Sequence, residues 1–218
     1  MKLTQENIQQ LDKRLQVSGI KYLDVRVELI DHLVTEYEAM DNAQDWNLFV
    51  KNRLPWCKKV MKDKSKTTHW SYQRSLWKTF FEILKETRVL FGIIFFIGLM
   101  FFIRPWLTDG QYFMALILPM LTFLIWQIAL MVKNGLGKEK RNSCISAKYL
   151  FNIFALPNLI LYLLNLLLQL NRDLVLNQFF IIPYVIFGSL LGLAAIRLFK
   201  KKRDVVIAEY NKLVQYSL

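Results

Sequence analysis

Apolar residues of this 218-residue chain are gathered into four long runs in its second half, and the charged residues lie outside the cores of these runs. The runs cover residues 89–106, 112–132, 149–170 and 179–199. A helix of about 20 residues crosses roughly 30 Å of hydrocarbon, because each residue adds about 1.5 Å. The pattern therefore predicts an all-α fold, namely an integral membrane four-helix bundle with a small N-terminal cytoplasmic helical domain.

Charge and periodicity divide the rest of the chain. Residues 1–56 are expected to form the cytoplasmic helical domain, and residues 57–88 a basic aromatic interfacial helix or linker. The four membrane helices fill residues 89–199, and residues 200–218 are expected to be a cytoplasmic tail. The two cysteines, Cys57 and Cys144, fall in segments expected in the reducing cytoplasm, so we expect two thiols and no disulfide.

Residues 1–56 show helical periodicity in three stretches. Thr4 is the expected N-cap of the first helix, and Gly19 is expected to end it in the left-handed conformation. A second helix is expected from about residue 21 to 40, and a third from about Ala43 to Leu54, ended by Pro55. On the second helix the expected apolar stripe is Leu23, Val27, Ile30, Val34 and Tyr37, widened by Val25, Leu29 and Leu33, and the opposite face is expected to be acidic, with Asp24, Glu28, Asp31 and Glu38.

Basic residues are unevenly distributed among the segments that connect the apolar runs. The connection after the first run holds Arg104, and the one after the third holds Arg172. The remaining segments are rich in cations: Lys133, Lys138, Lys140, Arg141 and Lys148 follow the second run, and Lys200, Lys201, Lys202 and Arg203 follow the fourth. The positive-inside rule predicts a multi-pass protein of the bacterial inner membrane with both termini in the cytoplasm. This distribution accounts for much of the net charge of +12, so no nucleic-acid partner is expected.

The second helix carries the run GIKYLDVRVELIDHLVTEYEAM, residues 19–40. This run resembles the start of a group of uncharacterised four-span membrane proteins of Bacteroidota, in which a helix with the pattern ELxDH precedes a basic aromatic segment and a membrane bundle. More loosely it is similar to the helical signalling domain of bacterial membrane proteins associated with PadR-type regulators. The resemblance covers about residues 8–85. It implies a regulatory or scaffolding role at the membrane and supplies no activity and no site residues.

Glu28, His32 and Glu36 recur at every fourth position of that helix and therefore share one face, with Asp31 adjacent. Carboxylates and an imidazole at this spacing are candidate ligands of a divalent metal, or a pH-sensing group. The alternative is that His32 forms a hydrogen bond with Glu28 or Glu36. We favour the hydrogen bond, because a metal site needs three or four convergent ligands and the other histidine, His69, is remote in sequence. No cofactor is expected.

The segment before the first apolar run combines cations with regularly spaced aromatic residues. Such a helix is typical of a membrane surface, with its rings among the headgroups and its charges toward anionic lipid. The alternative interpretation is a solvated linker. The candidate lipid-surface residues are Lys58, Lys59, Lys62, Lys64, Lys66, Trp70 and Trp77.

Two features inside the apolar runs predict helix contacts. Polar side chains in the third run share one helical face, and small residues in the fourth run form a GxxxG pair. The candidate interaction residues are Asn158, Tyr162, Asn165 and Gln169 in the third run, and Gly188 and Gly192 in the fourth. We expect both sets to pack the bundle of one chain, with Gln127 as a further candidate. Dimerisation, docking on another membrane protein, or a ligand or lipid groove are the alternatives.

No Asp, Glu, Lys, Arg or His lies within the core of any apolar run, whereas ion-coupled carriers generally need buried ionisable groups. We therefore predict a non-enzymatic regulatory or scaffolding subunit of the inner membrane. It would bind a protein partner, another membrane protein or a second copy of itself, through its cytoplasmic helices and its bundle. Two alternatives are an accessory or permease-type subunit of a transport complex and an enzyme acting on lipid through Glu28, Asp31 and His32.

Overall fold

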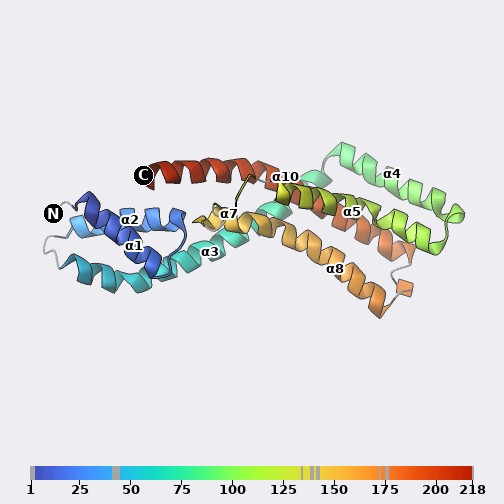
Figure 1. Ribbon diagram of the computed structural model, residues 1–218. Coiled ribbons are helices and arrows are strands. Elements are labelled where there is room, and N and C mark those ends of the chain that lie inside the picture. Colours follow the sequence, from blue (N-terminus) through green and yellow to red (C-terminus); the bar gives the residue numbers. More distant parts are fainter. Residues whose placement is uncertain are drawn as a thin grey trace. The chain divides into compact units, whose positions relative to one another are not determined.

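The computed structural model describes residues 3–40, 45–133, 135–137, 140, 143–171, 173–174 and 177–217. These residues form α-helices and short 3-10 segments, and they contain no strand (Figure 1). In chain order the elements are α1 (Gln5–Val17), α2 (Leu23–Glu38), α3 (Trp46–Leu84), α4 (Thr87–Ile103), η1 (Arg104–Trp106), α5 (Asp109–Val132), α7 (Ile145–Leu150), η2 (Phe151–Phe154), α8 (Ala155–Leu170) and α10 (Gln178–Ser217). The predicted all-α fold is confirmed.

Four of the helical stretches are long and apolar enough to cross a membrane. They are Thr87–Trp106, Asp109–Val132, Ile145–Leu170 and Gln178–Gln215, with 20, 24, 26 and 38 residues. Each contains one of the four predicted runs, so their number and position are confirmed. The protein is therefore compatible with a multi-pass membrane protein. Of the basic residues used to predict its orientation, Lys138, Arg141 and Arg172 lie outside the described residues.

The chain forms two compact units. One, here called the terminal unit, comprises Met1–Ser71, Gly135–Leu150 and Arg203–Leu218. The other, the bundle unit, comprises Tyr72–Asn134 and Phe151–Lys202. The terminal unit thus collects the N-terminal region, the connection between the second and third apolar helices, and the C-terminal end. Of the basic run that follows the fourth apolar run, Arg203 lies in the terminal unit, whereas Lys200, Lys201 and Lys202 lie in the bundle unit.

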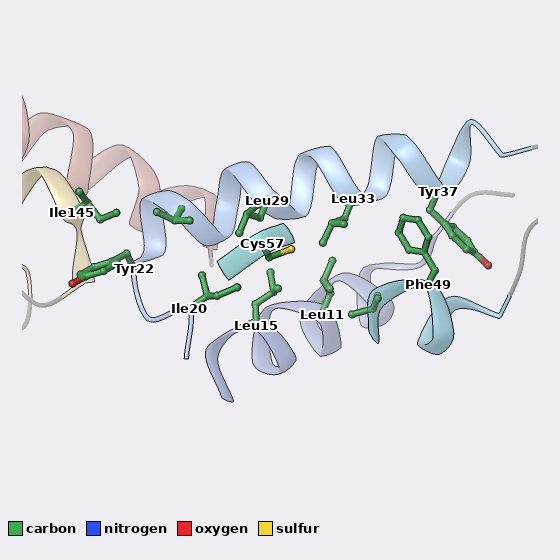
Figure 2. Close-up of a cluster of buried hydrophobic side chains, with 12 residues drawn as sticks. Leu11, Leu15, Ile20, Tyr22, Leu29, Leu33, Tyr37, Phe49, Cys57 and Ile145 are labelled. Atoms are coloured by element: carbon green, nitrogen blue, oxygen red, sulfur yellow. The ribbon is translucent and has the colours of Figure 1, made fainter. Parts of the chain in front are cut away.

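The core of the terminal unit is a cluster of apolar side chains shared by α1, α2 and the first part of α3 (Figure 2). Leu11 and Leu15 of α1 are fully buried, as are Leu29 and Leu33 of α2. Ile145, the first residue of α7, is buried in the same cluster. The complete cluster is Leu11, Leu15, Ile20, Tyr22, Val25, Leu29, Leu33, Tyr37, Phe49, Val50, Cys57 and Ile145.

Both predicted ends of the first helix are confirmed. The side-chain oxygen of Thr4 accepts a hydrogen bond from the backbone N–H of Asn7, which satisfies one donor at the start of α1. Gly19 has a φ of +96°, and the next N–H, that of Ile20, donates to the carbonyl of Leu15 at 3.0 Å. A residue with a β-carbon rarely adopts this conformation. Glycine at this position lets the chain reverse tightly from α1 into α2.

The prediction that Pro55 ends the third helix is wrong, because α3 continues through this proline from Trp46 to Leu84. Proline removes one backbone N–H from a helix. Here the residues on both sides are held by packing: Phe49 before it and Cys57 after it are buried in the same cluster, while Pro55 itself is exposed. Tertiary contacts therefore outweigh the local preference. The predicted start at Ala43 lies outside the described residues.

The buried face of α2 is rotated relative to the predicted stripe. Its centre is Val25, Leu29, Leu33 and Tyr37, whereas Leu23, Val27, Ile30 and Val34 lie at its edges, partly buried. The predicted acidic face is confirmed for Glu28, Asp31 and Glu38, which are exposed. It is wrong for Asp24, which is 7% exposed. Asp24 directly precedes Val25 and turns inward with it.

In the bundle unit, the glycine pair of α10 lies against its neighbours. A β-carbon at Gly188 would come within 2.5 Å of the methyl group of Met120 and 3.2 Å of Ile160. A β-carbon at Gly192 would meet Phe123 Cβ at 3.1 Å. The small residues therefore let α10 approach α5 and α8 closely. The prediction that Gly188 and Gly192 pack the bundle of one chain is therefore confirmed.

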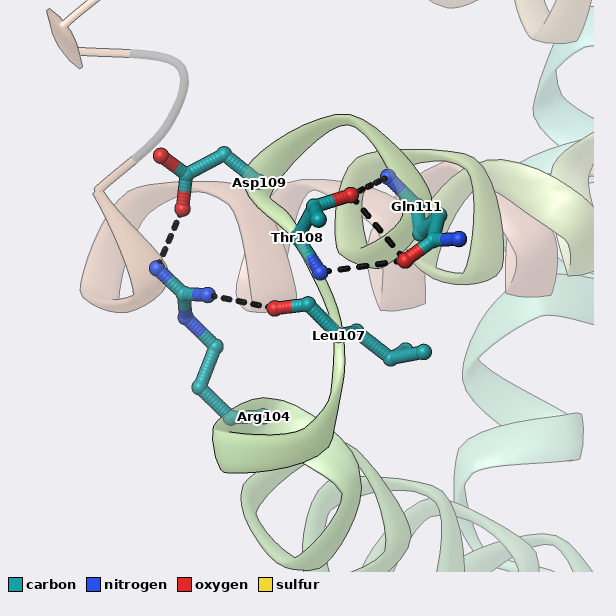
Figure 3. Close-up of polar contacts among 5 residues, drawn as sticks. All are labelled: Arg104, Leu107, Thr108, Asp109 and Gln111. Carbon is teal, nitrogen blue, oxygen red and sulfur yellow. Dashed lines mark hydrogen bonds and ion pairs between the residues drawn. The ribbon is translucent and has the colours of Figure 1, made fainter.

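The connection between α4 and α5 contains a network of hydrogen bonds and one ion pair (Figure 3). Thr108 and Gln111 form a capping box at the start of α5, in which each side chain accepts a hydrogen bond from the other residue's backbone N–H. The guanidinium of Arg104 pairs with Asp109 at 2.6 Å. The single cation of this connection is thereby neutralised by a neighbouring acid, in keeping with the contrast in loop charge seen in the sequence.

Candidate partner-binding site

The terminal unit has an open groove of about 490 Å³ between the C-terminal half of α1 and the first turns of α3. It forms because Leu11 and Leu15 turn α1 toward the core, leaving the opposite flank uncovered. The groove is lined by Lys13, Arg14, Val17 and Ser18 on one side and by Asn47, Val50, Lys51 and Leu54 on the other.

Apolar and cationic side chains are combined in this groove. Val17 is 89% exposed although it is aliphatic, and across the groove Leu54 is partly buried, while Val50 is 2% exposed and belongs to the core beneath. Lys13, Arg14 and Lys51 are exposed, and none of the eight lining residues is acidic. The groove therefore combines apolar side chains with positive charge along its edges.

Three carboxylates near the groove-forming helices, those of Asp12, Glu28 and Glu36, are paired with cations. Asp12 binds the largely buried guanidinium of Arg26 at 2.6 Å, which ties α1 to α2. Glu28 and Glu36 of α2 pair with Lys64 and Arg53 of α3. These ion pairs join the helices and leave the positive edges of the groove unchanged.

The sequence suggested that Glu28 and Glu36 either bind a metal or accept a hydrogen bond from His32, and the structure gives both carboxylates a different role. Glu28 and Glu36 pair with cations of α3, and His32, which was expected to hydrogen-bond with one of them, is exposed. Among the described residues, no three His, Cys, Asp or Glu side chains converge as metal ligands. Glu28 and Glu36 therefore join α2 to α3 by ion pairs at the edge of the buried face.

Asp24 is the polar residue that the periodicity missed. Its carboxylate accepts hydrogen bonds from the backbone N–H of Ile145 at 3.1 and 3.3 Å, and from that of Val25 at 3.0 Å. Burial raises the pKa of Asp24, and the hydrogen bonds from Ile145 and the charge of Lys64 partly oppose this rise. No local sequence signal could have identified Ile145 as its partner, since the two residues are 121 positions apart.

Both cysteines are free, as the sequence predicted, and the structure shows in addition that both are buried. Burial raises the pKa of Cys57. Burial and the charge of Asp24 raise the pKa of Cys144 to about 12. The thiolate is the reactive form of cysteine, so both side chains are poor nucleophiles at neutral pH.

The candidate lipid-surface residues lie on the outer side of α3. Lys58, Lys59, Lys62 and Lys66 are exposed, and Trp70 and Trp77 are 60% and 38% exposed. Lys64 differs, because it pairs with Glu28. The inner face of the later part of α3 consists instead of Tyr72, Leu76, Phe80 and Ile83. The two tryptophans are thus accessible, as an interfacial role would require.

Three of the four side chains in the polar stripe of the third run do not pack within the chain, which corrects for them the prediction made together with the glycines. Tyr162 is 67% exposed, Asn165 and Gln169 are also exposed, and Asn158 is partly buried. Gln127, by contrast, is 3% exposed and lies beside Gly192. The buried face of α8 is formed by Pro157, Ile160 and Leu164.

No family model, curated protein or solved structure matches the chain. The resemblance drawn from residues 19–40 therefore stays a prediction.

Proposed function

We propose that this protein is a non-enzymatic regulatory or scaffolding subunit of the bacterial inner membrane. It binds an acidic amphipathic helix of a protein partner in the groove between α1 and α3. The observation that carries the proposal is an open groove that combines the exposed Val17 and the partly buried Leu54 with three exposed cationic side chains and no acid in the lining.

A helix suits this groove better than an extended strand. The groove lies between two helices, so a third helix can pack its apolar stripe against both. Its anchors would recur at the third and fourth positions and contact Val17 and Leu54. Acidic residues flanking the stripe would face Lys13 and Lys51, and such complementarity speeds encounter and fixes the orientation of the bound helix.

The membrane side of the proposal rests on the four apolar helices and on the loop charges. Both termini lie in the cytoplasm in this topology, so the groove faces cytoplasmic partners. The exposed lysines of α3, with Trp70 and Trp77, favour contact with anionic headgroups. Each cation near such a surface contributes about 1 kcal/mol.

Site-specific photo-crosslinking of the full-length protein in its native membrane tests the proposal. A photo-reactive amino acid replaces Val17 in the groove or, as the matched control, Val205, an exposed valine of the terminal unit on α10. We expect the Val17 probe to give a protein adduct that maps to an acidic amphipathic helix, and the Val205 probe not to give this adduct.

Charge reversal then tests the electrostatic part. The double variant Lys13→Glu/Lys51→Glu should strongly reduce the adduct, whereas Lys21→Glu/Lys212→Glu, which changes the same net charge on exposed positions outside the groove, should preserve it. Adducts with lipid alone, or a protein adduct that is indifferent to charge reversal in the groove, would reject the proposed site.

A further inference from the structure

The two sides of α8 have different surroundings. Its inner side packs within the bundle unit: Ile160 lies against Gly188 of α10, and its carbonyl accepts a hydrogen bond from the hydroxyl of Tyr184 at 2.6 Å. Asn158, Tyr162, Asn165 and Gln169 form a separate polar row, here called the amide stripe. At about 100° per residue, these four side chains fall within an arc of about 60° on the flank of the helix.

The amide stripe is exposed in a part of the chain that is otherwise apolar. Three of its four side chains are exposed, and the side-chain oxygen of Asn158 is buried without a hydrogen-bond partner among the described residues. The neighbouring surface consists of leucines, including Leu159 and Leu166. In a membrane, amide groups that face acyl chains lose the hydrogen bonds that water would give them. A monomer therefore leaves this stripe poorly satisfied.

We infer that the amide stripe is a self-association surface, in which α8 of one copy packs against α8 of a second copy. The two copies are inserted with the same orientation, so the symmetry axis of a closed dimer runs along the membrane normal. Such an axis brings residues of the stripe close to their own copies. A carboxamide has both a donor and an acceptor, and it can therefore pair with an identical group.

The spacing of the stripe fits this arrangement. Its members are separated by four, three and four residues, which is the seam spacing of helices packed with a left-handed twist. A polar residue in such a seam fixes the alignment of the two helices, because any shift separates the paired amides. Asn165 and Gln169 would serve as the paired amides, with the hydroxyl of Tyr162 between them and Asn158.

The stripe favours a second copy over an unrelated membrane protein because its members are self-complementary and uncharged. A stripe with a net charge would point to a partner of opposite charge, and a row of donors alone would point to an acceptor. The glycine pair, which is the other association motif in the chain, is already occupied by Met120 and Phe123. The inference is independent of the partner proposed for the groove.

Disulfide trapping of full-length protein in membranes tests the inference. Asn165→Cys lies on the stripe, and Leu163→Cys lies on the outer leucine face of the same helix. The native thiols stay buried in both variants. We expect a cross-linked dimer from Asn165→Cys and little from Leu163→Cys. Equal trapping at both positions, or preferential trapping at Leu163→Cys, would overturn the inference, and so would cross-linking of Asn165→Cys to a different protein.

Dimerisation measured by energy transfer between labelled copies in lipid vesicles provides a second readout. Asn165→Leu should lower the association constant about threefold, the factor equivalent to the roughly 0.6 kcal/mol average for a hydrogen bond between membrane helices. Asn165→Gln should retain more association than Asn165→Leu. The inference would also be overturned if the wild-type protein, helical and correctly inserted, stayed monomeric at all densities. Dimerisation of Asn165→Leu/Gln169→Leu equal to that of the wild type would overturn it as well.

Discussion

The carboxylate of Asp24 accepts hydrogen bonds from the backbone N–H of Ile145, the first residue of α7. It thereby caps the start of this short helix from a separate helix, α2. A second contact joins the same elements, because the ammonium group of Lys148 donates to the hydroxyl of Tyr22 at 2.7 Å. Tyr22 and Asp24 belong to the run GIKYLDV, so this run holds the segment that leads into the third apolar helix.

Replacing Asp24 by alanine should release α7 from α2. The substitution leaves the N–H of Ile145 and that of Val25 without their acceptor in a buried place. We expect a loss of about 1–2 kcal/mol in the unfolding free energy, the usual value for a lost helix cap. We also expect faster hydrogen exchange at Ile145, measured by mass spectrometry of the protein in detergent.

Asp24→Asn and Asp31→Ala serve as controls for this substitution. Asparagine keeps a side-chain oxygen that accepts a hydrogen bond, so exchange at Ile145 should stay slow. Asp31 is exposed on the same helix, and its removal should change the unfolding free energy by less than about 0.5 kcal/mol. Slow exchange at Ile145 in Asp24→Ala would show that the cap contributes nothing.

The stability of the terminal unit should depend on pH through Asp24. Its pKa in the folded state is raised by burial, so the folded state retains this proton at a pH where the unfolded chain has released it. Stability conferred by Asp24 is therefore greatest below its unfolded pKa of about 3.9, and it falls as the pH rises toward the folded pKa. Above the folded pKa the contribution becomes constant.

The difference in unfolding free energy between wild type and Asp24→Asn isolates this effect, because all other titrating groups are common to both proteins. The unfolding free energy of the wild type minus that of Asp24→Asn should decrease as the pH is raised from about 4 toward neutrality. Circular dichroism of thermal unfolding at a series of pH values provides the measurement. A raised pKa of Asp24 would be contradicted if this difference stayed constant or increased as the pH rises.

Local signals account for the parts of the fold that could be predicted. An apolar run of membrane length indicates a spanning helix by itself, and the helix ends at Thr4 and Gly19 depend on the residues of a single turn. Pro55 shows the limit of such signals. Its neighbours Phe49 and Cys57 are fixed by contacts with α1 and α2, and these contacts cannot be derived from the residues around the proline.

The candidate sites were less predictable for the same reason. Periodicity shows that Asn158 and Gln169 share a helical face, but it does not show whether another helix covers that face. Asp24 sits between the two faces of α2, and its burial depends on Ile145 from a distant segment. The groove beside Val17 exists only because of how α1 meets α3. Each of these features is set by tertiary packing.

Two glycine substitutions should have opposite effects on the bundle unit. Gly192→Ala places a methyl group 3.1 Å from Phe123 Cβ, which is attached directly to the backbone of α5 and has little room to move. We expect a destabilisation of about 1–3 kcal/mol, as for other overpacked interiors. Gly98→Ala in α4 meets nothing within 4 Å and should be neutral or stabilising by up to about 1 kcal/mol.

Unfolding in mixed detergent micelles, followed by tryptophan fluorescence, compares the two glycine variants with wild type. Both variants add the same methyl group to a membrane helix, so any difference reports the packing at the two positions. A Gly192→Ala protein as stable as Gly98→Ala would mean that α5 and α10 do not approach each other closely at this point.

Cysteine labelling should establish the orientation of the protein with little background. The wild-type thiols, Cys57 and Cys144, are buried and have raised pKa values, so a membrane-impermeant maleimide should not label the folded wild type at neutral pH. Asp109→Cys, next to the α4–α5 connection, should then react from the periplasmic side of spheroplasts. Lys66→Cys on α3 should react only after the membrane is permeabilised. Labelling of Asp109→Cys solely from the cytoplasmic side would reverse the proposed topology and place the groove outside the cell.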